Sequence, residues 1–206
     1  DLPAHGHVAV AGRAARWPGG TTDELRGIVR ASGNAITIVP LLRWDVSSSF
    51  GHLNGAQNDS VRHGGFLRDA DRFGNASFGI SPAEAAVMDP QQRLLLEVGF
   101  SSFAVAGLRR AALMHSGTGV YLGIMNVDYQ PACLALTSVF AATCRSLSIA
   151  AGRLSFALGL RGACQSVDTA CSSALVAMHA ALAGTKLGEH SKSLCASVSL
   201  ILSPLA

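Results

Sequence analysis

The segment VDTACSSAL, residues 167–175, determines how the rest of this chain is interpreted. A short segment with β-branched residues ends there, Cys171 follows, and small polar residues then open an apolar segment that continues to Leu187. This order predicts a strand, a sharp turn and a helix, which is the arrangement of a nucleophile elbow. Cys171 stands at the turn and is the candidate nucleophile.

The predicted place of Cys171 suggests what its thiol can do. A residue at the start of a helix lies at the positive end of the helix dipole, where the first N–H groups have no partner within the helix. Those groups can stabilise a thiolate, or the oxyanion of a thioester under attack. The neighbours Ala170, Ser172 and Ser173 are small and leave room for an acyl chain. A buried structural thiol is the alternative that these residues alone leave open.

Patterns on both sides of the elbow alternate between strands and helices. Strand patterns cover 118–125, 165–170 and 193–202. Helical patterns cover 91–106, 146–158 and 172–187. The alternation predicts an α/β fold with a mixed, mostly parallel sheet flanked by helices. Neither an internal repeat nor a Pro/Ser/Gly linker divides the sequence, so residues 1–206 are interpreted as one domain.

The N-terminal part carries weaker, local signals. Residues 7–11 (HVAVA) alternate and predict a short strand. Thr21 or Thr22 predicts the cap of a helix that starts at Asp23. Residues 40–73 are polar, Gly-rich and weakly periodic, which predicts a long excursion with little regular structure.

Two helix starts are marked more strongly. Ser81 and Asp89 are each followed by proline, and Ser and Asp are good N-caps while proline fits the first helical position. Gly107 predicts the end of the helix that Asp89 begins.

Composition restricts the classes of partner. Hydrophobic residues make up 49% of the chain and charged residues 14%, against about 25% charged in average globular proteins. A chain so short of charged surface is expected to face other protein: a dimer partner, a missing domain, or both. The net charge of +3 is scattered, without a run of like charges, which argues against a nucleic-acid or membrane-surface partner.

Targeting features are few. No apolar stretch reaches the roughly 18 residues that cross a bilayer, so no membrane span is expected. The sequence has no initiator Met, and its start is interpreted as a cut or processed end.

The cysteines predict a reducing compartment, cytoplasmic or organellar. Five occur, at Cys133, Cys144, Cys164, Cys171 and Cys195. None of them forms a C-x-x-C pair, so buried, reduced thiols are expected, with at most one special cysteine. No metal site is expected, and the seven histidines are interpreted as structural.

Several segments together resemble one protein family. VDTACSSAL resembles the active-site segment of β-ketoacyl synthases, and FGISPAEAAVMDPQQRLLLEV (78–98) resembles the ketosynthase domains of type I modular polyketide synthases. TGVYLG (118–123), SLSIAAGRLSFALGLRG (146–162), VAVAGRAARWPGG (8–20), RWD (43–45) and GGFL (64–67) are similar too. The similarity covers essentially the whole chain, in order.

The resemblance implies a fold and a reaction. The fold would be thiolase-like, with two similar α/β halves, and this chain would be the N-terminal half only. Cys171 would accept an acyl group from the phosphopantetheine arm of an acyl carrier protein. Decarboxylative Claisen condensation with a malonyl-type extender would follow, which makes the chain an acyltransferase of polyketide or fatty-acid type. No metal or organic cofactor is implied beyond that arm.

The resemblance also implies what the chain lacks and whom it meets. Two histidines that assist decarboxylation, and a second oxyanion donor, belong to the C-terminal half. This half alone is therefore expected to load an acyl group but not to complete condensation. The implied partners are the carrier protein, the missing half, and a second copy bound through the strand before the nucleophile. Met125, Asp128 and Tyr129 would line the acyl tunnel as substrate-binding residues.

Two alternatives are kept. A catalytically incomplete half-domain could serve as a structural or interaction subunit of a larger assembly. It is favoured by departures from the family pattern at 99–103 (GFSSF), at Cys164 and at Ser197. A thiolase-fold relative, such as a chalcone-type synthase, is disfavoured by DPQQRLLLE, residues 89–97.

Overall fold

The computed structural model describes residues 7–50, 54–129, 140, 143 and 146–204. The chain divides into two compact units, and each is described by itself. The first unit consists of Asp1–Ala14 and Phe73–Ser199. The second consists of Ala15–Arg72 and Leu200–Ala206. That residues 1–206 form a single domain stays a prediction.

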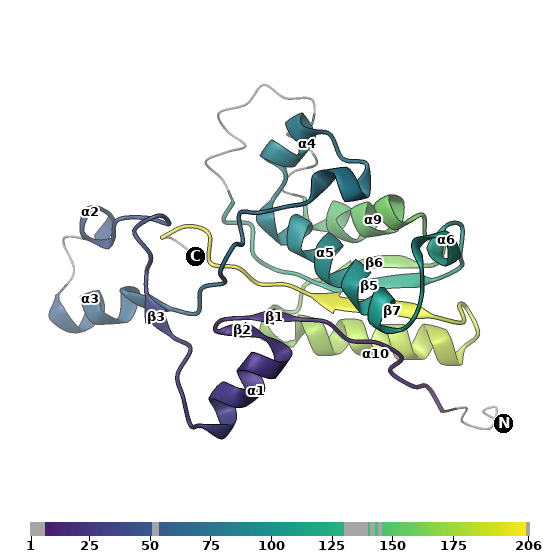
Figure 1. The fold of residues 1–206 in the computed structure, drawn as a ribbon, viewed down its shortest axis with the longest axis horizontal. Coiled ribbons are helices and arrows are strands. Elements are labelled where there is room, and N and C mark those ends of the chain that lie inside the picture. The colour runs from purple at the N-terminus through teal and green to yellow at the C-terminus, as the bar shows by residue number, and fades with distance from the viewer. Residues whose placement is uncertain (1–6, 51–53, 130–139, 141–142, 144–145, 205–206) are drawn as a thin grey trace. The chain divides into compact units, whose positions relative to one another are not determined.

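A three-stranded parallel sheet forms the centre of the first unit (Figure 1). Its strands are β5 (Gly119–Gly123), β6 (Cys164–Val167) and β7 (Ser193–Ser197), in the order β6-β5-β7. In the register, Val120 lies between Cys164 on one side and Leu194 on the other. β5 is buried along its whole length, as expected for the central strand of a parallel sheet. The predicted α/β fold with a parallel sheet is confirmed.

Helices cover both faces of this sheet (Figure 1). α10 (Ser173–Lys186) packs on one face against all three strands. α9 (Leu147–Leu158) and α5 (Pro90–Val105) pack on the other. The core between α5, α9 and the sheet contains fully buried aliphatic side chains, among them Leu96, Val120, Leu122, Leu154 and Leu158. The burial of β5 between two helical layers explains its unbroken apolar pattern.

The helix starts that the sequence predicts in this unit are confirmed. Ser81 caps α4 (Pro82–Val87) by accepting a hydrogen bond from the Glu84 N–H at 3.1 Å. Asp89 caps α5 in the same way, with the Gln91 N–H at 2.7 Å. After α5, Gly107 takes a left-handed φ of 76°, a conformation that often ends helices and that glycine adopts readily. The described part of the unit also contains the short helices η1 (Asn75–Phe78) and α6 (Arg110–Leu113).

The predicted strand at residues 7–11 is wrong. Residues 7–15 have no regular secondary structure, and Val8 and Val10 are 47% and 84% exposed. A strand needs a neighbour to satisfy its N–H and C=O groups, and no described strand pairs with this segment. The alternating pattern of residues 7–11 was therefore not sufficient to predict a strand.

Local signals determine the start of the second unit. β1 (Arg16–Trp17) and β2 (Gly20–Thr21) form an antiparallel pair across a two-residue turn. Thr21 then caps α1 (Thr22–Arg30), and its side chain and that of Glu24 form a capping box. The predicted helix is confirmed, one residue earlier than expected.

The prediction of little regular structure over 40–73 is only partly correct. β3 (Thr37–Ile38) pairs antiparallel with β4 (His63–Gly64), and two helices, α2 (Val46–Phe50) and α3 (Gly55–Val61), lie between them. The start of α3 is explained by Asn54, whose side chain accepts from the Gln57 N–H at 3.0 Å. Weak hydrophobic periodicity hid these helices, because none of the described residues of either helix is buried. No helix in the described part of the chain is long and apolar enough to span a membrane.

Candidate functional site

Cys171 lies at the turn between β6 and α10, where the sequence predicts it. β6 ends at Val167, a short helix η2 (Ala170–Ser172) carries Cys171, and α10 follows directly at Ser173. The Cys171 side chain is free and exposed. Ala170 has a φ of 54°, a left-handed conformation that costs a residue with a β-carbon free energy. The predicted strand, turn and helix are confirmed, while the catalytic role of Cys171 stays a prediction.

A set of short-range hydrogen bonds holds this turn. The Ser173 hydroxyl accepts from the Thr169 N–H at 2.9 Å and donates to the Ala170 carbonyl at 2.7 Å. Asp168 Oδ1 accepts from the Ala170 N–H at 3.1 Å, and the Ser172 hydroxyl donates to the Thr169 carbonyl at 2.8 Å. The polar residues of the DTACSS segment therefore satisfy the backbone of their own turn.

The elbow sits against the end of β5 because Gly123 has no side chain. A β-carbon on Gly123 would lie 2.7 Å from the carbonyl carbon of Ser173 and 2.8 Å from the nitrogen of Ala174. These atoms belong to the first turn of α10, immediately after Cys171. Gly123 thus allows the helix that follows the nucleophile to approach the central strand.

Gly123→Ala is expected to lower the free energy of unfolding by about 1–3 kcal/mol, since the clashing atoms are backbone atoms that cannot rotate away. Urea unfolding followed by circular dichroism measures the change. Gly152→Ala is the matched control: it lies within α9, and a β-carbon there meets nothing within 4 Å. That control should be neutral or stabilising. Equal stability of the two variants would contradict the proposed close approach.

The loop after β5 leaves the same edge of the sheet as the elbow, because parallel strands end together. It carries the three predicted substrate-binding residues, Met125, Asp128 and Tyr129. Met125 is 40% exposed, and Asp128 and Tyr129 are half-buried. Their substrate-binding role stays a prediction.

The first turn of α5 holds this loop. Gln91 Nε2 donates to the Asn126 carbonyl at 2.9 Å, and Arg93 Nη2 donates to the Tyr129 hydroxyl at 3.4 Å. Arg93 also donates to the Met88 carbonyl through Nε at 2.9 Å. The DPQQR segment therefore positions the loop that carries the predicted substrate-binding residues. The sequence singled out this segment for its resemblance, and the structure gives it a physical task.

Burial raises the pKa of Asp89 from its usual 3.8 to about 6. Asp89 is 2% exposed, and the nearby Asp128 carboxylate raises the pKa further. Hydrogen bonds from Gln91 and the charge of Arg93 oppose that rise but do not cancel it. Asp89 is thus a buried acid at the start of α5.

A partly buried polar network joins α4, α5 and α9. Arg153 Nε donates to the Gln92 side-chain oxygen at 2.7 Å, and Arg153 Nη1 forms an ion pair with Glu84. Arg153 Nη2 donates to the Thr143 hydroxyl at 3.2 Å. The Arg153 and Glu84 side chains are 10% and 23% exposed, so water screens this pair poorly. The sequence patterns did not identify this network, because Gln92 and Arg153 lie far apart in the chain.

The other cysteines and the histidines give a mixed outcome. Cys164 is exposed, so the expected burial of the ordinary thiols is wrong for it, while Cys195 is partly buried and burial raises the pKa of its thiol. Cys133 and Cys144 lie outside the described residues, as do His5 and His52. Of the described histidines, only His190 is buried, where its ring packs on Tyr121 with centroids 5.4 Å apart. The described residues contain no cluster of His, Cys, Asp and Glu that could hold a metal.

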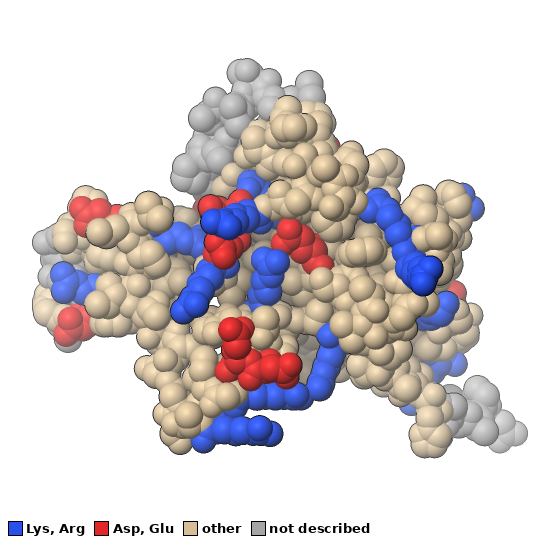
Figure 2. All heavy atoms as spheres, viewed as in Figure 1, with Lys and Arg blue, Asp and Glu red and all other residues tan. Residues whose placement is uncertain are grey.

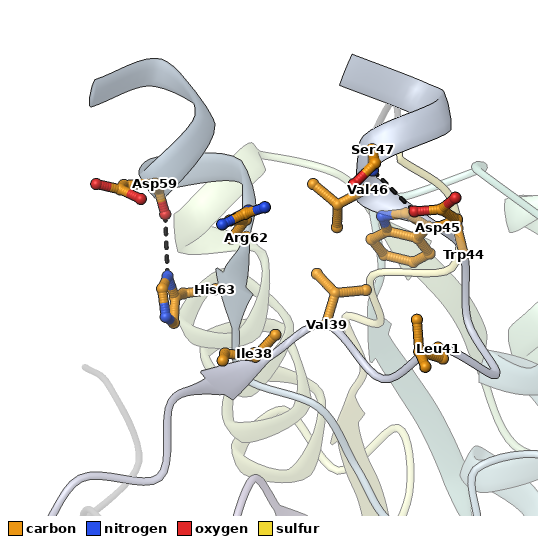
Figure 3. Close-up of a pocket in the computed structure, with 10 residues that line it drawn as sticks. All are labelled: Ile38, Val39, Leu41, Trp44, Asp45, Val46, Ser47, Asp59, Arg62 and His63. Atoms are coloured by element: carbon orange, nitrogen blue, oxygen red, sulfur yellow. Dashed lines mark hydrogen bonds between the residues drawn. The ribbon is translucent and has the colours of Figure 1, made fainter. Parts of the chain in front are cut away.

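A hollow of about 340 Å³ lies in the second unit between α2 and α3 (Figure 3). Apolar side chains of Ile38, Val39 and Leu41 line one part of it. The Trp44 indole also lines it, and its buried N–H has no hydrogen-bond partner among the described residues. No cysteine lines this hollow, so it is distinct from the elbow.

Residues other than Lys, Arg, Asp and Glu make up most of the face shown in Figure 2. Acidic and basic side chains are interspersed on the face shown, and the basic ones do not gather into one large patch. α10 exposes a row of apolar side chains, with Leu175 at 70% and Met178 at 57% exposure. This apolar row agrees with the expectation that part of the chain faces other protein.

Comparison with known proteins identifies a family and several relatives that this chain resembles. Residues 6–206 match the family model described as beta-ketoacyl synthase, N-terminal domain. Polyketide synthase GfsE of Streptomyces halstedii is 39% identical over 96% of this chain and 5% of its own length. The pikromycin polyketide synthase component PikAII of Streptomyces venezuelae is 40% identical over 96% of this chain and 6% of its own length.

Solved structures show the same similarity. The ketosynthase from module 6 of the bacillaene synthase of Bacillus subtilis 168 superimposes with a TM-score of 0.84 at 34% identity. That match covers 96% of this chain and 33% of the ketosynthase chain. The oxazolomycin ketosynthase domain OzmH KS7 of Streptomyces albus JA3453 gives a TM-score of 0.79 at 30% identity. The chain therefore spans about a third of the length of these solved chains.

Proposed function

The chain belongs to the β-ketoacyl synthase family, as its N-terminal domain, and we propose that Cys171 is its acyl-accepting nucleophile. The carrying observation is the exposed thiol at a strained elbow, directly before a long helix. The Cys171 sulfur would attack the thioester carbonyl of an acyl carrier protein. A new carbon–sulfur bond forms on Cys171, and the phosphopantetheine thiol leaves with the proton. The product is an acyl-enzyme ready for condensation with a malonyl-type extender.

The elbow supports the loading step on physical grounds. Exposure gives the phosphopantetheine arm access to Cys171. The first N–H groups of α10 have no partner within the helix and lie at its positive end. Such groups can stabilise negative charge on the sulfur or on the tetrahedral intermediate. Condensation would need the decarboxylation histidines, which the resemblance assigns to a C-terminal half.

The acyl-loading prediction is tested on the full chain. Incubation with an acyl-carrier thioester, followed by peptide mass spectrometry, is expected to show one acyl adduct, on Cys171. Cys171→Ser should abolish the stable thioester adduct. Cys164→Ser is the matched control, because Cys164 is also a free and exposed thiol. Equal labelling of the cysteines, or an adduct that survives Cys171→Ser, would disprove the special role of Cys171.

Three protein partners are proposed on the same basis. The carrier protein delivers the acyl group. A C-terminal ketosynthase half would cover the apolar row on α10, where Leu175 and Met178 are exposed. A second copy would pair with β6, whose outer edge no described strand covers. Analytical ultracentrifugation with and without a C-terminal half separates the last two proposals.

The substrate-binding role of the loop after β5 is proposed as well. Met125 and Val127 are 40% and 43% exposed, at the sheet edge from which the elbow also leaves. Exposed apolar side chains there suit an acyl chain better than a charged substrate. No metal or organic cofactor is proposed beyond the carrier's phosphopantetheine arm. A reducing compartment, cytoplasmic or organellar, suits a reaction that needs a free thiol.

The alternative function is that of an interaction subunit without catalysis. The exposed row on α10 favours it, because an apolar surface can bind another protein whether or not Cys171 reacts. Loading separates the two functions: an interaction subunit would bind a C-terminal half while Cys171 stays unmodified.

A further inference from the structure

The turn that carries Cys171 is held in a conformation that its own sequence disfavours. Ala170 has a φ of 54°, and an alanine in the left-handed region is disfavoured because its β-carbon crowds the carbonyl oxygen. Such a conformation persists only where neighbouring groups enforce it. The Ala170 side chain has no polar group, so a neighbouring residue must hold this left-handed conformation.

Ser173 is the residue whose side chain spans this bend. Its hydroxyl oxygen accepts the Thr169 N–H at 2.9 Å and donates its proton to the Ala170 carbonyl at 2.7 Å. The Ser173 hydroxyl oxygen therefore joins the backbone N–H of Thr169 to the backbone carbonyl of Ala170. The other side chains of the turn each reach only one end of it: Asp168 binds the Ala170 N–H, and Ser172 binds Thr169.

Ser173 is itself fixed in place. It is 5% exposed, although it is a small polar residue at the start of a helix. Its backbone lies where a β-carbon on Gly123 would be only 2.7 Å away. The hydroxyl is thus anchored on the central strand, and a buried hydroxyl with both its donor and an acceptor position used is well placed to determine local geometry.

We propose that Ser173 is a positioning residue for Cys171: its buried hydroxyl, seated against Gly123, holds Ala170 in the left-handed conformation that presents the Cys171 thiol. Cys171 lies in the chain between Ala170 and Ser173. Loss of either hydrogen bond therefore changes where the thiol lies relative to the first turn of α10. Ser173 itself need not touch substrate. The inference deepens the proposed function, because it concerns the presentation of the same thiol.

Ser173→Ala is expected to slow alkylation of Cys171 by iodoacetamide about tenfold, because both hydrogen bonds of the Ser173 hydroxyl are lost. The rate is measured on the full chain by peptide mass spectrometry, relative to the rate at Cys164, which is also exposed. A purely structural effect would lower the melting temperature without changing the ratio of the two rates. A ratio within twofold of the wild-type value, or a rise in it, would overturn the proposal.

Rescue makes the test independent of folding defects in the single variant. In the double variant Ala170→Gly/Ser173→Ala, glycine adopts the left-handed conformation without help, so the alkylation ratio should return to within about threefold of wild type. Ser102→Ala is the matched control, because its hydroxyl also donates to a carbonyl three residues earlier, at 2.8 Å, within α5. It should leave the ratio unchanged. A folded double variant that stays as slow as Ser173→Ala would contradict the role of the bend.

The two proposals fail separately. Alkylation reports the position of Cys171 whether or not the chain accepts an acyl group. Wild-type chain that loads an acyl group, with a Ser173→Ala ratio equal to wild type, would refute the positioning role alone. Wild-type chain that never loads, with a clear effect of Ser173→Ala on alkylation, would refute acyl transfer alone.

Discussion

Arg153→Met is expected to lower the free energy of unfolding of the first unit by about 3–5 kcal/mol. The guanidinium forms an ion pair with Glu84 and donates at 2.7 Å to Gln92, so its removal leaves the Glu84 carboxylate without its counter-charge in a partly buried place and takes one donor from Gln92. Methionine keeps the apolar volume but supplies no donor. Chemical denaturation followed by circular dichroism of the helices measures the loss.

Two further variants identify the cause of that loss. In Arg153→Met/Glu84→Met the unpaired carboxylate is gone, so a large part of the lost stability should return. Arg72→Met removes an exposed ion pair with Asp69, at 3.1 Å in the second unit, and should lower the free energy of unfolding of that unit by less than about 1 kcal/mol. If Arg153→Met lowers the free energy of unfolding as little as Arg72→Met does, the network around Arg153 does not stabilise the fold.

Asp89→Asn is expected to stabilise the protein at pH 7 and to remove a dependence of stability on pH. The folded pKa of Asp89, about 6, lies above its ordinary 3.8, so the folded state binds the proton more tightly than the unfolded state. The stability that this tighter proton binding contributes to the folded state is fully present below about pH 4 and is lost as the pH rises through about 6. The two pKa values correspond to roughly 3 kcal/mol across this window.

Asparagine keeps the N-cap but cannot ionise. It loses the hydrogen bond from Gln91 Nε2, which is 3.3 Å long in the native protein, at a cost of about 1 kcal/mol. The variant should therefore be about 2 kcal/mol more stable than the native protein at pH 7 and slightly less stable at pH 4. Unfolding in urea at each pH measures the difference.

Asp128→Asn tests the second cause of the raised pKa. It removes the neighbouring carboxylate, so the native pH dependence should persist but become smaller. If Asp89→Asn leaves the difference between pH 4 and pH 7 unchanged, Asp89 is not the titrating group.

The local parts of this fold were predictable from sequence. Ser81 and Asp89 each begin a helix through their own side chains, and the helix at Thr21 begins with the Glu24 carboxylate accepting the Thr21 N–H, all within three residues of the cap. The order of strand, turn and helix around Cys171 is equally local. Such features depend on short-range chemistry that the sequence displays directly.

Non-local parts were not predictable in the same way. Residues 7–11 alternate like a strand, but a strand also needs a partner edge that a single segment cannot reveal. Cys164 has the apolar character of a buried thiol, yet β6 lies at the edge of the described sheet and exposes it. The network around Arg153 and the approach of Gly123 to Ser173 join residues that only the folded chain brings together.

One part of the candidate site could likewise be predicted from a local pattern, and another part could not. The nucleophile was identified from one segment, because cysteine, small neighbours and a helix start occur together there. Ser173 was noted only for its size, and its two hydrogen bonds become visible only when the bend at Ala170 is known. A serine in the first turn after a strand–Cys–helix junction is the sequence feature that indicates this role.

β5 leaves the ribosome long before either strand that pairs with it. Its two neighbours begin at Cys164 and Ser193, so both pairings close long loops, and such pairings slow folding. Until residue 193 has been synthesised, Val120 and Leu122, which are fully buried in the finished sheet, lack one of their flanking strands. Apolar strands that lack a neighbour make a partly folded chain prone to aggregation, so this interval carries that risk. A chaperone that covers residues 119–123 in that interval would therefore raise the yield of folded protein.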